Sequence, residues 1–244
     1  STMFQQGWIS EHNFPPMIAA MILIDKIFQD HKEDTAKIVE LCAAPGHKTA
    51  AMAEWGAFRF AQQQKKKWPN IIAVDRSNIR FNSLREEIPR LGLENITLKS
   101  MRLEKALHEW PELQGIADYL LLDPPCSALG TRPKLYLQHT QAELENYPNN
   151  QERILPYADK YLRPGGILMY NTCTIPKEEN EEMIAHFVND LHYKILSPPA
   201  EYRLYAETGL SIDTFSKQES EKLMRFYPHL DEGIGYFAAI LQKP

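Results

Sequence analysis

Short apolar runs alternate with amphipathic segments along most of this 244-residue chain, and this alternation limits the possible folds more than any other feature. Alternating strands and helices indicate an α/β fold, with a mostly parallel sheet that has helices on both faces. We predict strands at residues 37–41, 71–74, 96–98, 117–122 and 166–170, and a closing pair at 193–196 and 236–241. We predict helices at residues 17–28, from 50 onward, and at 79–91, 141–161 and 177–191, with loop and short helix over 200–234.

The bulk composition excludes several classes of protein. With 27 basic and 32 acidic residues the net charge is −5, a poor fit to a protein that holds nucleic acid by overall charge. Three cysteines form no even disulfide framework, so we expect an intracellular, cytoplasmic setting. No apolar stretch is long enough for a membrane span and the eight histidines lack metal-ligand spacing, so we expect neither a membrane nor a metal.

Two cysteine motifs directly follow two of the predicted strands, Asp123-Pro124-Pro125-Cys126 and Asn171-Thr172-Cys173-Thr174. Ligands of open α/β sheets bind outside the carboxyl ends of the strands, so both thiols are expected to face one pocket. Two prolines stiffen the first loop, because each fixes its own φ angle. A pair of thiols over a cofactor site suggests covalent catalysis, which requires a lowered thiol pKa or a nearby base. The alternatives are a rigid turn and a small buried core residue.

A turn of small residues, Cys42 to Lys48, joins the first strand to the next helix. Small residues allow the backbone to approach a ligand, and the N-terminus of a helix attracts polar groups. The dinucleotide fingerprint G-x-G-x-x-G is absent, and a plain strand-to-helix turn is the alternative. Asp75 ends the second strand, where an acidic residue holds ribose hydroxyls in nucleotide-binding folds or simply caps the following helix.

A basic turn follows the first cysteine motif and contains Arg132, Pro133 and Lys134. Cations beside an active site suit a substrate that carries phosphate, and we expect this role for Arg132. The alternative is a solvated surface turn.

Taken together and in this order, these motifs resemble the Nop/Sun family of RNA cytosine-C5 methyltransferases, over roughly residues 7–242. The motifs that carry the resemblance are residues 42–49, Asp75, residues 123–127, Arg132-Pro133, residues 172–174 and Gly235-Tyr236-Phe237. Thr174-Ile175 and the acidic run 178–182 look most like the branch that methylates transfer RNA and carries an RNA-binding PUA domain. No PUA domain is recognised here, so we expect a missing RNA-binding domain or a partner subunit.

The resemblance implies a Rossmann-like class I methyltransferase fold with a seven-stranded sheet and S-adenosylmethionine as the cofactor. Residues 1–30 would be a helical lead-in, and residues 31–244 the catalytic domain. The residues that would bind the cofactor are Cys42, Ala43, Ala44, Pro45, Gly46, His47, Lys48, Asp75, Arg80 and Asp123.

The resemblance also implies the roles of the residues that act on cytosine. Cys173 would attack C6 of the base, and Asp123 would hydrogen-bond the pyrimidine edge. Cys126 would assist release of the enzyme, while Pro125 and Arg132 would contact the RNA, with transfer RNA as the expected partner. The target base must be unstacked to present its face to Cys173, which favours loops and single-stranded ends.

The chain departs from the family pattern at two positions. His47 stands where a small residue is usual, and Arg102 stands near the third strand end, where the family usually has an Asp that reads the adenine amine. Glu104 would replace that Asp if the loop shifts. Losing one hydrogen bond to adenine would cost about 0.5–1.5 kcal/mol of binding free energy.

Two competing hypotheses remain at the level of the sequence. Arg102 and the acidic net charge favour a catalytically silent member of the family that acts as an RNA-binding or protein-binding scaffold. A methyltransferase that acts on protein or small molecules is also compatible with the fold, although simple N- or O-methylation requires neither thiol.

Overall fold

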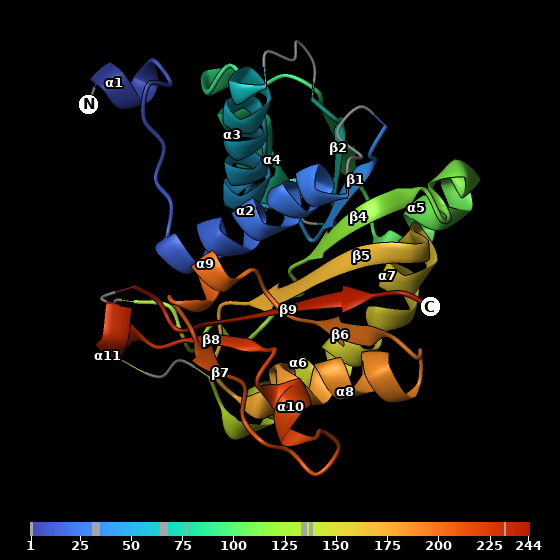
Figure 1. The fold of residues 1–244 in the computed structure, drawn as a ribbon. Helices are drawn as coiled ribbons and strands as arrows, with labels where there is room; N and C mark the ends of the chain where they lie inside the picture. The colour runs from blue at the N-terminus through green and yellow to red at the C-terminus, as the bar shows by residue number, and fades with distance from the viewer. Residues whose placement is uncertain are drawn as a thin grey trace.

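A central sheet separates two layers of helices in the computed structural model, which describes residues 2–30, 35–63, 68–76, 78–132, 136, 139–231 and 233–244 (Figure 1). The strands within these ranges are β1 (Ile38–Leu41), β2 (Ile71–Asp75), β3 (Ile96–Ser100), β4 (Ala117–Leu122), β5 (Leu162–Thr172), β6 (Lys194–Leu196), β7 (Glu207–Thr208), β8 (Met224–Phe226) and β9 (Tyr236–Gln242). They are ordered β3-β2-β1-β4-β5-β9-β8-β7, and β6 also pairs with β9.

The first five strands form the parallel half of the sheet and confirm the predicted α/β class. β1 pairs with β2 and β4, β2 pairs with β3, and β4 pairs with β5, all in parallel. β1, β2 and β4 are almost fully buried, as expected for a parallel sheet with helices on both faces, whereas β3 at the edge of the sheet is only partly buried. Because β4 and β5 are neighbours, the loops that carry the two cysteine motifs leave the same edge of the sheet side by side.

The antiparallel half is larger than the sequence suggested. β9 pairs with β5 on one side and with β6 on the other, which confirms the predicted closing pair. The expected number of seven strands is wrong, since the described residues form nine. Residues 200–234, predicted as loop and short helix, contain β7 and β8. β8 has only three residues and its central residue is Arg225, so it lacks the apolar pattern by which a buried strand is recognised.

The helices lie in two layers. One face of the sheet carries α2 (Phe14–Gln29), α3 (His47–Gln62) and α4 (Asn78–Arg90), and the other carries α5 (Leu103–Glu109), α6 (Gln141–Glu152), α7 (Leu155–Tyr161) and α8 (Glu181–Asn189) (Figure 1). The short helices are α1 (Thr2–Gln5), α9 (Ala200–Arg203), α10 (Lys217–Ser220) and α11 (Pro228–Asp231). None of the helices described is both long enough and apolar enough to cross a bilayer.

Two predicted helices have different bounds in the structure. The segment predicted as one helix at 141–161 is divided into α6 and α7, because Pro156 lacks the N–H group that a continuous helix would use. The segment predicted as a helix at 177–191 begins instead with a 3₁₀ turn, Lys177–Glu179, before α8 starts at Glu181.

The predicted lead-in contributes to the same core as the rest of the chain. Ten of the sixteen residues of α2 are buried, and the helix packs against α3. Its buried Asp25 accepts hydrogen bonds from Trp55 at 2.9 Å and from Tyr202 at 2.5 Å, which ties α2 to α3 and α9. α2 therefore packs in the same hydrophobic cluster as residues of β1, α3, β4 and β5.

Candidate active site

The structure brings the two predicted thiols together. Cys126 follows β4 and Cys173 follows β5, and their Sγ atoms are 3.3 Å apart. Both cysteines are free and partly buried. This separation is a hydrogen-bonding distance for sulfur, so one thiol serves as donor and the other as acceptor.

The pKa values of the two thiols are shifted in opposite directions. The hydrogen bond from Cys126 lowers the pKa of Cys173, and the nearby Lys48 ammonium lowers it further, although burial and Asp123 oppose this. The same hydrogen bond raises the pKa of Cys126 well above that of an ordinary thiol, and burial adds to the effect. The arrangement therefore favours Cys173 as thiolate and Cys126 as thiol. A thiolate is the nucleophilic form of cysteine.

An ion pair lies beside the thiols. Lys48, in the first turn of α3, donates a hydrogen bond to the carboxylate of Asp123, the first residue after β4. Burial opposes the charge on Lys48, but Asp123 more than offsets this, so the pKa of the ammonium is raised. From its motif, Lys48 was predicted only to be part of the cofactor turn. Its contact with Asp123 depends on how β1 and β4 pair, which no local motif reveals.

A buried polar network holds the two cysteine loops in place. The carboxylate of Glu179 accepts hydrogen bonds from the backbone N–H and hydroxyl of Ser127, at 2.8 and 2.5 Å. The Ser127 hydroxyl also lies 2.6 Å from that of Thr174, on the loop of Cys173. Gln151 of α6 contacts Glu179 and the carbonyl oxygen of Pro125, both at 3.1 Å. Sequence reasoning missed Glu179, because a run of acidic residues usually indicates a solvated face.

Gly130 and Gly235 lie so close together that neither position has room for a side chain. Gly130 N–H donates to the carbonyl of Cys173 at 3.0 Å, and Gly235 N–H donates to the carbonyl of Gly130 at 2.8 Å. A Cβ added to Gly130 would lie 1.9 Å from the Gly235 carbonyl oxygen. A Cβ added to Gly235 would lie 2.9 Å from the Cα of Gly130, which accounts for the glycine of the Gly-Tyr-Phe motif. The next residue, Tyr236, donates to Asn171 at the end of β5.

The small-residue turn lies against the end of β2. Asp75, the last residue of β2, is 2% exposed, and its carboxylate accepts a hydrogen bond from the Ala44 N–H at 3.0 Å. Gly46 precedes α3 with φ of 111°, and a Cβ there would lie 2.4 Å from a methyl carbon of Leu84. The strand-to-helix turn is thus held close to the acidic residue predicted to bind ribose.

A groove of about 640 Å³ opens at this edge of the sheet. Cys42, Asp75, Arg80 and Pro125, all predicted site residues, contribute to its lining. Pro125 directly precedes Cys126, so the groove reaches the loop that carries the thiol. Burial raises the pKa of the Cys42 thiol, which favours its protonated form.

Arg102 and Glu104 lie at the groove, whereas Arg132 does not line it. Arg102 and Glu104 both line the groove, and their charged atoms are 4.0 Å apart. Glu104 is therefore present where a replacement for the usual Asp was expected. Arg132 is exposed and donates to the carbonyl of Pro228 at 3.1 Å. Pro133 and Lys134 lie outside the described residues.

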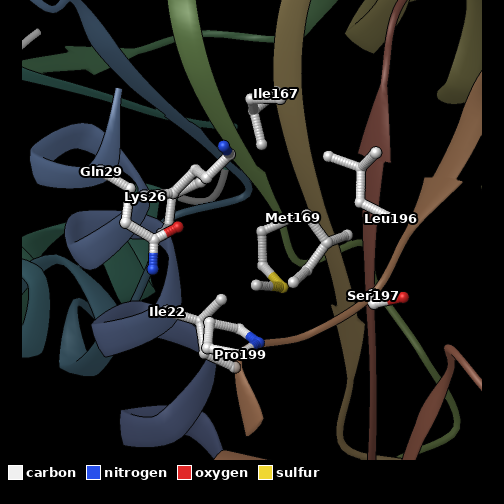
Figure 2. Close-up of a pocket in the computed structure, with 10 residues that line it drawn as sticks. Ile22, Lys26, Gln29, Ile167, Met169, Leu196, Ser197 and Pro199 are labelled. Atoms are coloured by element: carbon white, nitrogen blue, oxygen red, sulfur yellow. The ribbon is translucent and has the colours of Figure 1, made fainter. Parts of the chain in front are cut away.

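A second hollow lies away from the predicted site residues. It has a volume of about 250 Å³ and lies between α2 and β5, with Ile22 and Lys26 on one wall and Ile167 and Met169 on the other (Figure 2). No predicted site residue lines it. Within the described ranges, no group of three or more His, Cys, Asp or Glu side chains is arranged to hold a metal ion.

Known proteins resemble this chain over most of its length. The family described as 16S rRNA methyltransferase RsmB/F matches residues 26–242. The tRNA (cytosine(72)-C(5))-methyltransferase of Pyrococcus horikoshii is 33% identical over 240 residues, which covers 98% of this chain and 54% of that protein. Human NSUN6, a protein of the same description, is 31% identical and covers 79% of this chain and 40% of its own length.

A solved structure shows the same fold. The crystal structure of NSun6 from Pyrococcus horikoshii with SFG has a TM-score of 0.78 and 31% identity, and the match covers 100% of this chain and 55% of that one. The chain thus spans about half the length of the relatives it matches. The match over residues 26–242 and the shared fold show that the chain belongs to the RsmB/F family, the Nop/Sun family that its motifs resemble.

Proposed function

We propose that the protein transfers a methyl group from S-adenosylmethionine to C5 of a cytosine in RNA, with transfer RNA as the substrate. The observation that carries this proposal is the pair of unequal thiols, 3.3 Å apart, beside the Lys48–Asp123 ion pair. The relatives named as tRNA cytosine-C5-methyltransferases support the substrate class. N- or O-methylation of other substrates would use neither thiol.

The residues of the groove fit this cofactor. Asp75 presents a buried carboxylate at the groove, which suits the hydroxyls of a ribose, and the tight turn at Gly46 allows backbone contact with a ligand. Residues 42–48 would hold the methionine part, with Arg80 beside it. Glu104 offers a carboxylate to the adenine amine. When bound, the cofactor supplies an electrophilic methyl group.

Cys173 is the proposed nucleophile. C5 of cytosine is a weak nucleophile, and addition of a thiolate at C6 converts the ring into an enamine with a reactive C5. The new S–C6 bond uses the thiolate electron pair, the C5=C6 pair shifts to form C4=C5, and the C4=N3 pair moves onto N3. The Lys48–Asp123 pair, which shares a hydrogen-bonded proton, would stabilise the negative charge that develops on the ring.

Cys126 is the proposed residue for release. After methylation the C5 proton must leave, so that its electrons re-form C5=C6 and expel Cys173 as thiolate. While Cys173 is bonded to C6 it has no charge, and the largest cause of the raised Cys126 pKa is then removed. Cys126 can then give its own proton to a water molecule, and the resulting thiolate can accept the one from C5.

Replacing each cysteine in turn tests the proposal, because the two variants should behave differently. Cys173→Ala should abolish transfer of labelled methyl to cytosine in an RNA transcript. Cys126→Ala should slow release and leave RNA covalently attached to the protein, visible on a denaturing gel. Methyl transfer retained by Cys173→Ala would disprove the covalent route.

Calorimetry tests the cofactor separately from the RNA. S-adenosylmethionine should bind the wild-type chain, and Asp75→Ala should bind it much more weakly. Absence of binding by the wild type would instead favour the catalytically silent scaffold, for which Arg102 is the motivating residue.

The whole protein is proposed to contain more than this chain. Because the relatives are about twice as long, we propose that an RNA-binding domain or a partner subunit supplies most of the RNA affinity. We also propose the cytoplasm as its compartment, since a reducing environment keeps Cys126 and Cys173 free.

A further inference from the structure

The groove beside the thiols has a charge opposite to that of the chain. Five cationic residues line it, Arg76, Arg80, Arg102, Arg153 and Lys160, against the two carboxylates of Asp75 and Glu104. The net charge of this lining is +3 in a chain whose net charge is −5. S-adenosylmethionine is itself cationic, so the cofactor does not account for this excess.

The outer wall of the groove is a stripe of polar, aromatic and cationic side chains on α6 and α7. It consists of Tyr147, Asn150, Arg153, Tyr157 and Lys160, which recur every three or four residues and all line the groove. Tyr147 and Asn150 lie on α6, Arg153 directly follows α6, and Tyr157 and Lys160 lie on α7. The groove stripe, as we call these five residues, therefore presents a continuous surface.

One end of the groove stripe lies near the loop that carries Cys126. The Tyr147 ring packs edge-on against His139, with centroids 5.5 Å apart, and His139 Nε2 lies 3.0 Å from the carbonyl of Ser127, the residue after Cys126. Arg153 follows Tyr147 by six residues, a rise of about 9 Å along a helix. A strand whose target base lies at Cys173 could therefore extend along this wall.

The cations of the groove stripe are available to an anionic partner. Arg153 is exposed and has no ion pair within the described residues, and Lys160 is exposed with its ammonium 5.6 Å from the Tyr157 ring centroid. Interleaved aromatic and cationic side chains are the pattern by which proteins hold single-stranded nucleic acid, through base stacking and phosphate contacts.

We propose that the groove stripe binds the RNA strand flanking the target cytosine, with Arg153 and Lys160 on two phosphates and Tyr157 stacked on a base. This inference rests on the proposed function and extends it by giving the position of the RNA strand on the protein. The negative strand would also offset the repulsion between the cationic groove and the cationic cofactor. RNA and cofactor should therefore strengthen each other's binding.

The salt dependence of RNA binding tests the two phosphate contacts. A fluorescent single-stranded RNA would be titrated with wild type, Arg153→Gln and Lys160→Gln at several salt concentrations. The slope of log affinity against log salt changes by about 0.7 for each phosphate contact to a single strand. Each variant should lose about 0.7 of slope and bind several-fold more weakly at low salt. Lys105→Gln, an exposed cation of α5 outside the groove lining, should match wild type.

The outcomes separate this inference from the proposed function. Wild-type slopes and affinities in both variants would overturn the placement of the RNA, even if the enzyme methylates cytosine. Reduced slopes in both variants would support it, even if no methyl transfer were found. Variants that weaken only S-adenosylmethionine binding, measured without RNA, would assign the cations to the cofactor and also overturn the inference. Equal melting temperatures would confirm that all variants are folded.

Discussion

The hydrogen bond between the two sulfur atoms makes Cys173 more acidic than its neighbour. Cys126→Ala removes the donor, so the pKa of Cys173 should rise and its alkylation profile should move to higher pH. The rate of reaction with iodoacetamide at each pH, followed by mass spectrometry of the peptide containing Cys173, measures this. Cys126→Ser keeps a hydroxyl donor and should lie closer to wild type. An unchanged profile in the alanine variant would contradict the assigned direction of the hydrogen bond.

Glu40 gives a second residue-level prediction, this time about stability. It lies in β1, only 1% exposed, and accepts a hydrogen bond from Thr49 at 2.5 Å. Burial raises the pKa of its carboxyl to about 8, from a usual value of 4.5. The folded state thus holds a proton that the unfolded state releases, and stability from this proton is complete below pH 4.5 and is lost as the pH rises through 8.

The matched variant is Glu40→Gln, which resembles the protonated carboxyl and does not titrate. The free energy of unfolding of the wild type should fall more steeply between pH 5 and pH 8 than that of the variant. Urea unfolding at several pH values would show this as a difference between the two curves. Parallel curves would mean that Glu40 is already ionised in the folded protein.

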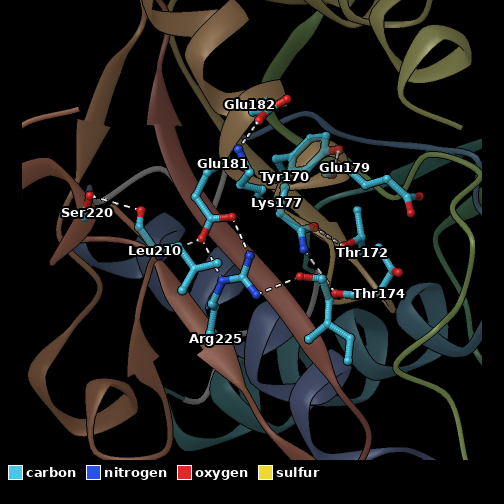
Figure 3. Close-up of polar contacts among 12 residues, drawn as sticks. Tyr170, Thr172, Thr174, Lys177, Glu179, Glu181, Glu182, Leu210, Ser220 and Arg225 are labelled. Atoms are coloured by element: carbon cyan, nitrogen blue, oxygen red, sulfur yellow. Dashed lines mark hydrogen bonds and ion pairs between the residues drawn. The ribbon is translucent and has the colours of Figure 1, made fainter. Parts of the chain in front are cut away.

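A buried ion pair joins two secondary-structure elements, β8 and α8. Arg225 donates to both carboxylate oxygens of Glu181, with Nε at 2.6 Å, and to the carbonyl of Ile175 at 2.8 Å (Figure 3). The two side chains are 2% and 0% exposed. Arg225 thus fastens the antiparallel half of the sheet to the loop that follows Cys173.

Arg225→Met should leave the Glu181 carboxylate buried without its partner and destabilise the fold by about 3–5 kcal/mol. The exposed pair Lys177–Glu182, in the same view, is the control, and Lys177→Ala should leave the unfolding free energy nearly unchanged (Figure 3). Chemical denaturation measures both. A small effect of Arg225→Met would show that Glu181 takes up a proton or reaches water instead.

The parallel strands and the antiparallel pair β6–β9 were predictable, whereas β7 and β8 were not, for a physical reason. β4 was predicted with its true bounds, because a buried strand of a parallel sheet is a continuous apolar run. The three-residue β8 is held by pairing with β9 and by the ion pair of Arg225, a contact between residues 44 apart in sequence. The thiols could likewise be identified from their motifs, whereas Glu179 turns inward only because Ser127 and Gln151 are brought to it by the fold.

At the scale of the molecule, we propose that the lead-in and the catalytic domain fold as one unit. A chain that begins at residue 31 loses the ten buried residues of α2, and should show no cooperative thermal unfolding. A chain that begins at residue 10 lacks α1, which buries no residue, and should melt near the wild-type temperature. Circular dichroism melts would compare the three chains. Cooperative melting of residues 31–244 alone would instead make the lead-in a separate addition.

The short distance between Cys126 and Cys173 also makes the protein vulnerable to oxidation. A disulfide has its sulfur atoms about 2.05 Å apart, so a small approach of the two loops would join them. Hydrogen peroxide would accept the two electrons and two protons and be reduced to water, and the nucleophile would be lost. Peroxide should therefore block alkylation of both cysteines, and dithiothreitol should restore it. The geometry that prepares Cys173 for attack thus makes a reducing agent a requirement for keeping the protein reactive.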